Sequence, residues 1–224
     1  MPPAVDSVSN ISSSGVGPFT LSHTCAGTNR LLRVNVMHYD SSDDVSGVTY
    51  NGVAMTAVPS GDATNGQYWL STFYLIAPDT GTHDVIVTVT GNVFDIGITA
   101  VSYIDVHQSV PLGTAVTATG TSTAPSVIVS SASDELVDDG LIIVNSGSLT
   151  VGAGQTQRVN TPTSNAFIKY ATSTEGGAAS TVMSWTNGTS QAWAIMAVPI
   201  KPVGGGGGSS IIPIQAYYRR RRAA

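Results

Sequence analysis

Apolar and polar residues alternate in short runs along most of this chain. Between Val5 and Lys201 the runs are rich in Val, Ile and Thr, and Gly, Asn, Pro and Asp separate them. In the segment 83–90, Val85, Val87 and Val89 fall on one face, as expected for a strand with one side on a core. No segment shows a convincing helical period, so the sequence predicts an all-β fold.

The pattern indicates about a dozen strands. We expect them at residues 31–39, 48–58, 68–77, 83–90, 96–106, 126–130, 135–144, 157–160, 165–172, 180–186 and 192–200. The segment 48–58 is a predicted hairpin, because Asn51-Gly52 accepts the positive φ angles of a two-residue turn. The runs 141–144 and 194–198 are apolar on both faces, which predicts central or interface strands.

A weak internal repeat links the two halves of the chain. Residues 31–36 resemble 141–145, residues 81–88 resemble 177–184, and residues 98–101 resemble 195–198. We expect one jelly-roll-like antiparallel β-sandwich over residues 1–203, made of two Greek-key halves, 1–110 and 111–203. Two small tandem sandwiches are the alternative.

The character of the chain changes after Val203. Residues 204–210 are Gly and Ser only, which suits a tether, and residues 211–224 are first apolar and aromatic and then basic. We interpret 211–224 as an extended, non-globular docking arm; a tail with no role is the alternative. Its expected partner-binding residues are Ile211, Ile212, Ile214, Tyr217, Tyr218, Arg219, Arg220, Arg221 and Arg222.

Charge is scarce and unevenly distributed. Only 10% of the residues are charged and 42% are hydrophobic, a composition that favours a packed body. Residues 1–203 hold all 14 acidic residues and five basic ones, a net −9, whereas the arm carries +4. An acidic body argues against nucleic acid and anionic membranes as partners of the body. The four arginines suit an acidic protein surface or a phosphate backbone.

Motifs for catalysis or metal binding are missing from the sequence. The single cysteine, Cys25, excludes an internal disulfide, and four scattered histidines form no zinc pattern. Two acidic groups, at 40–44 and 134–139, are alternatives for calcium but are read as solvated loops. Two carboxylates for glycoside hydrolysis would have to face each other across a cleft, which sequence spacing cannot show. We therefore expect no enzyme, no catalytic residue, no metal and no cofactor.

Aromatic residues offer a second kind of site. Tyr68, Trp69, Phe73 and Tyr74 lie close together, and Trp185 and Trp193 follow later. Exposed aromatic rings can stack on sugars. Because alternation sends Trp69 and Phe73 to one face of a strand and the tyrosines to the other, we expect at least one pair in the core. Glycan binding is therefore kept as an alternative function.

The N-terminal residues show neither a secretory signal nor a span long enough to cross a bilayer. We expect synthesis in a host cytoplasm.

Four segments carry a resemblance to a known group of domains. Residues 21–32 (LSHTCAGTNRLL), 48–55 (VTYNGVAM), 152–158 (GAGQTQR) and 193–202 (WAIMAVPIKP) resemble a β-sandwich domain that recurs in phage virion proteins and bacterial surface proteins. The similarity would cover most of residues 19–202 and leaves the arm outside. It implies a jelly-roll-like fold with a binding or structural role and transfers no catalytic residue.

These observations predict a phage structural protein located in the virion. The expected role is that of a capsid decoration or cement protein, whose sandwich lies outside the shell and whose arm binds the major capsid protein or another virion protein. We expect a homo-oligomer, with a trimer at local three-fold positions. The alternative is a carbohydrate-binding module or adhesin on a virion or cell surface.

Overall fold

Antiparallel β-strands make up most of the part of the chain that the structure, a computed structural model, describes, which is residues 1–204. The strands of the first half are β1 (Ala4–Val16), β2 (Phe19–Cys25), β3 (Leu31–Tyr39), β4 (Val45–Tyr50), β5 (Val53–Ala54), β6 (Thr56–Ala57), β7 (Ala63–Asn65), β8 (Tyr68–Ile76), β9 (Gly81–Val89) and β10 (Asn92–Ile104). Those of the second half are β11 (Val116–Ser122), β12 (Ser126–Val129), β13 (Leu136–Val144), β14 (Leu149–Val151), β15 (Thr156–Pro162), β16 (Ile168–Gly176), β17 (Thr181–Asn187) and β18 (Gln191–Ile200).

Each half of the chain builds its own pair of sheets. In the first half the orders are β1-β10-β3-β8-β6, with β7 also on β8, and β2-β9-β4-β5. In the second half they are β11-β18-β13-β16-β15 and β12-β17-β14. Every ladder between two of these strands stays within one half. In place of one sandwich shared between the halves, the described residues thus form two sandwiches.

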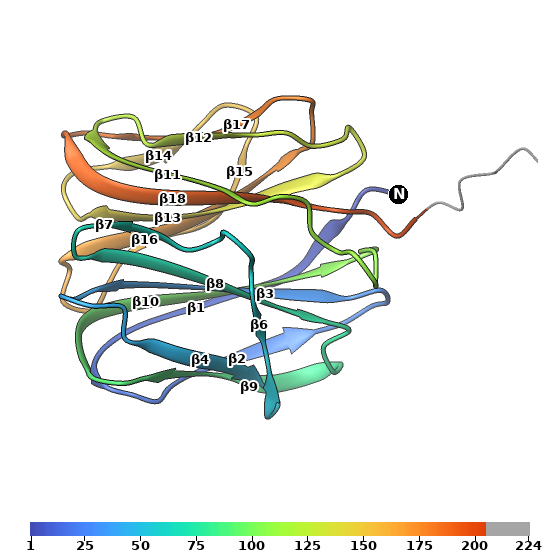
Figure 1. The fold of residues 1–224 in the computed structure, drawn as a ribbon, viewed down its shortest axis with the longest axis horizontal. Helices are drawn as coiled ribbons and strands as arrows, with labels where there is room; N and C mark the ends of the chain where they lie inside the picture. The colour runs from blue at the N-terminus through green and yellow to red at the C-terminus, as the bar shows by residue number, and fades with distance from the viewer. Residues whose placement is uncertain (205–224) are drawn as a thin grey trace, which may run out of the picture.

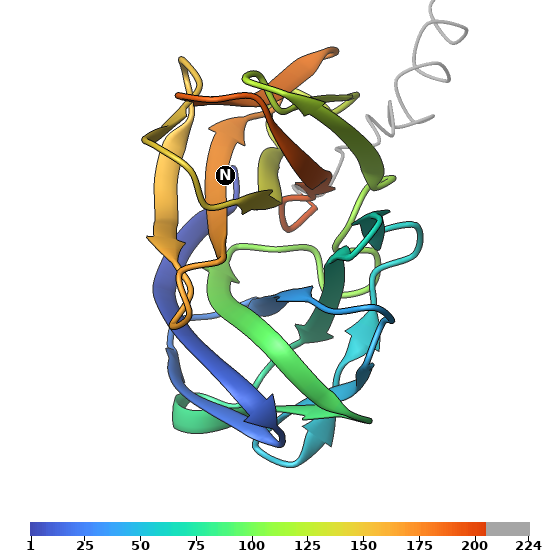
Figure 2. The ribbon, with the colours of Figure 1, turned by 90° about the vertical axis from the view of Figure 1, so that its left-hand side faces the viewer.

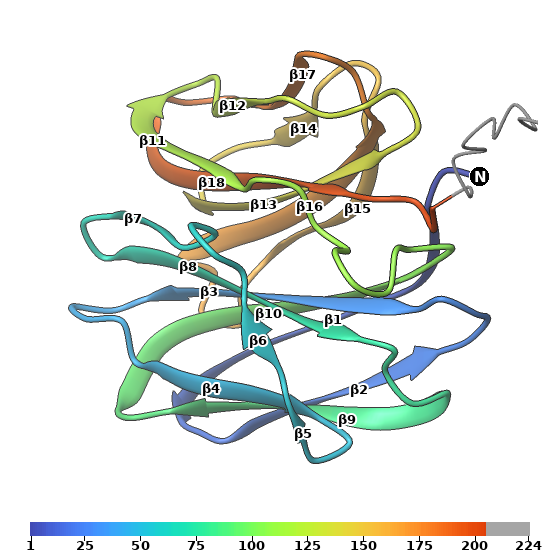
Figure 3. The same ribbon diagram turned by 45° about the vertical axis from the view of Figure 1, so that its right-hand side comes forward.

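The four sheets are stacked as layers (Figures 1 and 3). The sheet of β2, β9 and β4 forms one outer layer, and the sheet of β12, β17 and β14 forms the other. The sheets that contain β3 and β13 lie between them and face each other. The view along the strands in Figure 2 shows the same separation of the two halves.

Three main cores fill the spaces between the layers. Val34 and Val87 belong to the core within the first sandwich, and Trp185 and Ile195 to the core within the second. A third core joins the sandwiches, with Met37 among its members from the first half and Ile142, Tyr170 and Met196 among those from the second. The inner sheets are therefore buried on both faces, which requires apolar residues at successive positions.

Several local predictions from the sequence are confirmed. Asn51 and Gly52 have φ angles of 48° and 76° and join β4 to β5 as a tight turn. Val85 and Val87 in β9 are fully buried. The runs 141–144 and 194–198 lie in β13 and β18, which have a paired strand on both sides.

Other strands were absent from the sequence-based prediction. β1, β2, β7, β11 and β14 were not assigned. Of these, β1 and β11 hold many Ser, Thr or Gly residues, which weaken the strand signal. β1 and β11 lie at sheet edges, where only one side needs a partner strand and polar side chains are tolerated.

The contact between the sandwiches needs one close approach of backbone to side chain. Gly97 in β10 lies against the ring of Tyr170 from β16, so a β-carbon at position 97 would collide with the ring. The Tyr170 hydroxyl group also donates a hydrogen bond to Asn10 Oδ1 at 3.0 Å. The fit of the two halves therefore depends on a glycine inside a strand.

Candidate functional site

The nine arm residues predicted as the partner-binding site, Ile211 to Arg222, lie outside the described residues, as does most of the tether. What the structure does show is the point from which this segment leaves the body. This point is residues 201–203, called the arm root below. It directly follows β18 and lies at the same end of the molecule as the N-terminus (Figures 1 and 3).

The arm root is fixed by backbone hydrogen bonds to the segment that connects the two halves. Lys201 N–H donates to the Pro111 carbonyl at 2.8 Å, and His107 N–H donates to the Lys201 carbonyl at 3.0 Å. Val203 N–H donates to the Asp105 carbonyl at 2.7 Å. Backbone pairing of this kind continues the order of β18 up to Val203. The arm thus starts from a defined position.

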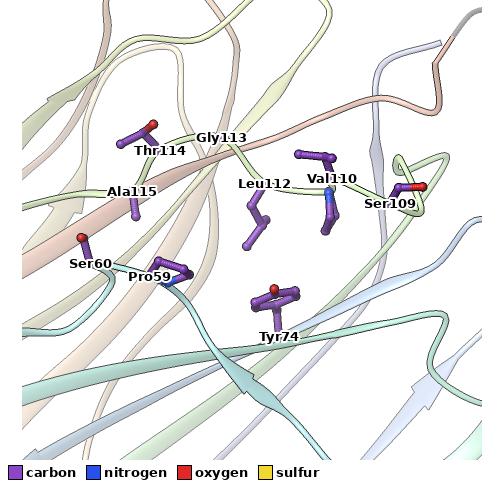
Figure 4. Close-up of a pocket in the computed structure, with 10 residues that line it drawn as sticks. Pro59, Ser60, Tyr74, Ser109, Val110, Leu112, Gly113, Thr114 and Ala115 are labelled. Carbon is purple, nitrogen blue, oxygen red and sulfur yellow. The ribbon is translucent and has the colours of Figure 1, made fainter.

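A groove opens beside the arm root, and we call it the root groove. It lies between residues 59–60, the ring of Tyr74 and the connecting segment 109–115, and its volume is about 340 Å³. In Figure 4, Leu112 points toward Tyr74 across the groove. Most of the side chains that line it are apolar: Pro59, Tyr74, Val110, Pro111, Leu112 and Ala115.

Apolar side chains remain partly exposed in this groove. Val110 is 54% exposed, whereas Leu112 and Tyr74 are half-buried and also pack on the core between the sandwiches. Beside Val110, the Nδ1 atom of His107 accepts hydrogen bonds from the N–H groups of Ser109 and Val110, both at 3.1 Å, and so holds the turn that forms one wall. The groove is a structured apolar surface open to solvent.

A buried ion pair lies at the centre of the contact between the sandwiches. Arg33 of β3 contacts Asp138 of β13, and both side chains are fully buried. Arg33 also donates to Asn35 Oδ1 at 2.9 Å, and Asn35 accepts a further hydrogen bond from Thr72. Burial raises the pKa of Asp138, and the Arg33 guanidinium opposes this shift. The pair joins the halves and has no access to substrate.

The next carboxylate, Asp139, points to the opposite face of β13. Its Oδ2 atom accepts a hydrogen bond from Trp185 Nε1 at 2.8 Å, and its Oδ1 atom accepts one from Ser173 N–H at 2.5 Å. Burial raises the pKa of Asp139 to about 7, and nearby Asp138 adds to the shift, while the donors from Trp185 and Ser173 oppose it. The Asp139 carboxyl group thus lies inside the second sandwich and changes its protonation state near neutral pH.

These positions correct the interpretation of residues 134–139 as one solvated acidic loop. Asp134 is exposed, but Asp138 and Asp139 are fully buried within a strand. The other acidic group stays near the surface, where Asp43 contacts the ring of the buried His38 at 3.3 Å. Within residues 1–204, no group of three or more His, Cys, Asp and Glu residues is arranged to hold a metal ion.

A third buried carboxylate, Asp95, was not singled out from the sequence. It lies in β10 and accepts hydrogen bonds from the Thr163 hydroxyl group and from the Phe167 and Asn165 N–H groups, the last two at 3.2 and 3.4 Å. Asp95 thereby ties the loop before β16 to the first sandwich. An isolated acidic residue inside an apolar run was the available signal.

Cys25 and His23, two side chains of chemically reactive types, lie in the interior of the first half. Cys25 is fully buried, and burial raises the pKa of its thiol. His23 is also buried, and burial lowers its pKa to about 4, although nearby Asp6 opposes the shift. Its Nδ1 atom lies 3.0 Å from Ser9 Oγ. Neither residue lines the root groove.

The alternation predicted for residues 68–74 is seen in the structure, where Phe73 packs against the core within the first sandwich and Tyr68 and Tyr74 pack against the core between the sandwiches. Trp185 and Trp193 are core residues, and Trp69 Nε1 donates to the Asp40 carbonyl at 3.1 Å. A surface cluster instead forms around Tyr39. The ring centroid of Tyr39 lies 5.3 Å from Tyr68, 5.7 Å from Phe94 and 4.4 Å from Phe167. Phe94 and Phe167 are 50% and 37% exposed.

The described residues contain no helix that could span a membrane. No protein-family model matches the chain, and no curated protein and no solved structure matches it either.

Proposed function

We propose that this chain is a structural protein of a phage virion, a capsid decoration or cement protein. Its sandwiches would lie on the outside of the shell, and residues 211–224 would bind the major capsid protein or another virion protein. The observation that supports this best is the arm root. A force applied to the arm is passed to β18, which pairs with β11 on one side and β13 on the other. Such a strand resists being peeled from its sheet.

We further propose that each half is a jelly roll. The eight strands of a jelly roll form two sheets that each alternate between early and late strands. Eight strands of the first half have the order β1-β10-β3-β8 in one sheet and β2-β9-β4-β5 in the other. The second half follows the same pattern in β11-β18-β13-β16 and β12-β17-β14 but departs from it at β15, which pairs with β16 at the edge of the larger sheet. Jelly rolls occur in viral capsid proteins and in lectins.

Charge and copy number give the proposal its mechanism. The body of residues 1–203 carries a net −9 and the arm +4, so the arm is attracted to acidic surfaces that repel the body. On a symmetric shell, many such arms acting together gain avidity from weak individual contacts. A trimer at local three-fold positions would present three arms to adjacent capsomers.

The test compares the full chain with a chain that ends at Val203. Each is mixed with shells assembled without this protein, and the bound amount is measured after sedimentation. We expect the full chain to saturate the shells and the shortened chain to remain in solution. A matched control keeps the length but replaces Ile211, Ile212 and Ile214 by Ser. Full occupancy by the shortened chain would refute the anchoring role.

Glycan binding is the second candidate function, and the aromatic cluster around Tyr39 is the observation in its favour. Rings that are one-third to one-half exposed, as Phe94 and Phe167 are, offer surfaces for sugar stacking. Binding to a glycan array that is lost in F94A/F167A but kept in the chain ending at Val203 would support this function over the first.

A further inference from the structure

The root groove lies beside the residues from which the tether begins. We propose that in the free protein residues 211–214, Ile-Ile-Pro-Ile, occupy the root groove of their own chain. The arm is then held against the body until another surface competes for it. The groove contact depends only on the chemistry of this chain, and only its release on a shell rests on the proposed function.

The groove shares its walls with the arm root. Lys201 N–H donates to the Pro111 carbonyl, and Gly113 N–H donates to the Pro199 carbonyl at 2.8 Å. Leu112 forms a bridge with Ile200. The wall formed by 111–113 is thus bonded directly to the last residues before the tether. Gly204, the first residue of the tether, lies beside His107, because a β-carbon on Gly204 would be 3.7 Å from the His107 ring. His107 in turn accepts the hydrogen bond from Val110 N–H that holds the wall of the groove.

The length of the tether allows residues 211–214 to reach the root groove and limits how far they can lie from it. Seven residues, 204–210, span at most about 25 Å when fully extended. A linker of this length gives its attached segment an effective concentration in the millimolar range. At micromolar protein concentrations the groove of the same chain therefore outcompetes the groove of a second copy.

The chemistry of the segment matches that of the groove. Three isoleucines and a proline have no polar side-chain atoms, and the groove is lined mainly by Pro, Val, Leu, Ala and a Tyr ring. A volume of about 340 Å³ lies at the lower end of the range of roughly 300–1,000 Å³ that is typical of ligand pockets. It admits a few apolar side chains rather than a folded domain. The following arginines would then lie on a body of net charge −9.

Disulfide trapping tests the contact directly. The native Cys25 is fully buried and its thiol pKa is raised, so it does not compete for oxidation. In the variant V110C/I212C, one cysteine lies in the groove and the other in the arm. The matched control is I128C/I212C, since Ile128 is 61% exposed but lies in β12 of an outer layer. Both variants are oxidised at micromolar concentration, and the products are measured by intact mass and non-reducing electrophoresis.

We expect a disulfide within one chain to form at least about tenfold faster in V110C/I212C than in I128C/I212C. Equal rates would overturn the proposal, because the arm would then have no preference for the groove. Covalent dimers as the main product would overturn it too, since the groove would hold the arm of a second copy.

This result is separable from the decoration role. If trapping fails while the full chain still sediments with shells, only the groove contact is refuted. If trapping succeeds while shell binding fails, the groove contact stands and the decoration role is refuted.

Discussion

The buried Asp139 carboxylate predicts an unusual dependence of stability on pH. Its pKa is about 7 in the folded protein, against 3.8 for an ordinary aspartate. The folded state therefore binds a proton more tightly than the unfolded state does. Stability from this group is complete below pH 3.8 and is lost as the pH rises through 7. Three pKa units correspond to about 4 kcal/mol in the free energy of unfolding.

The substitution D139N removes this titration and adds a constant cost. Both carboxylate oxygens accept hydrogen bonds, from Ser173 N–H and from Trp185 Nε1. An asparagine must turn its NH₂ group toward one of these donors, which costs about 1–3 kcal/mol at every pH. We therefore expect D139N to be less stable than the wild type at pH 4.5 and equally or more stable at pH 8.5.

Urea unfolding followed by circular dichroism, at intervals between pH 4.5 and 8.5, measures the two curves. D134N serves as the matched control, because Asp134 is exposed on the turn before the same strand. Its curve should run parallel to that of the wild type. If the D139N curve also stays parallel to the wild type across this range, the buried carboxylate does not titrate near pH 7 and the reasoning is wrong.

Variants at three further sites, Arg33, Gly97 and His23, test the packing between and within the halves. R33A leaves Asp138 buried without its partner and should lower the free energy of unfolding by about 3–5 kcal/mol in the same urea titration. R33M/D138L should lower this free energy by less, because no unpaired charge remains. G97A places a methyl group against the ring of Tyr170 and should cost about 1–3 kcal/mol; an unchanged melting temperature would show that the ring can move aside. Because burial lowers the pKa of His23 to about 4, the neutral ring stabilises the folded state fully above pH 6.5, and this stabilisation is lost as the pH falls to 4. H23Q should therefore reduce the drop in the free energy of unfolding between pH 6.5 and 4 by up to about 3 kcal/mol, as measured by urea titration.

Local features were within reach of the sequence because they depend on neighbouring residues. Alternation predicted the buried face of β9, and Asn51-Gly52 predicted the turn between β4 and β5. Runs that are apolar on both faces predicted the central strands β13 and β18. In each case the side-chain period or the required φ angle is written in a few consecutive residues.

Burial of polar residues could not be foreseen in this way. Asp134 and Asp138 look alike in the sequence, yet one is exposed and the other is paired with Arg33, which lies 105 positions away. Which carboxylate is buried depends on which strand is brought opposite it. The same applies to Phe94 and Phe167, which come from different halves and meet on the surface.

The sequence by itself determined the β character of the body, most of its strands and the separation of an acidic body from a basic arm. These follow from side-chain period, turn residues and charge, all of which are local. Only the tertiary structure decided that each half forms its own sandwich, that buried charges join the two, and that an apolar groove lies beside the arm root. Those features arise from contacts between segments far apart in the chain, for which no short sequence pattern exists.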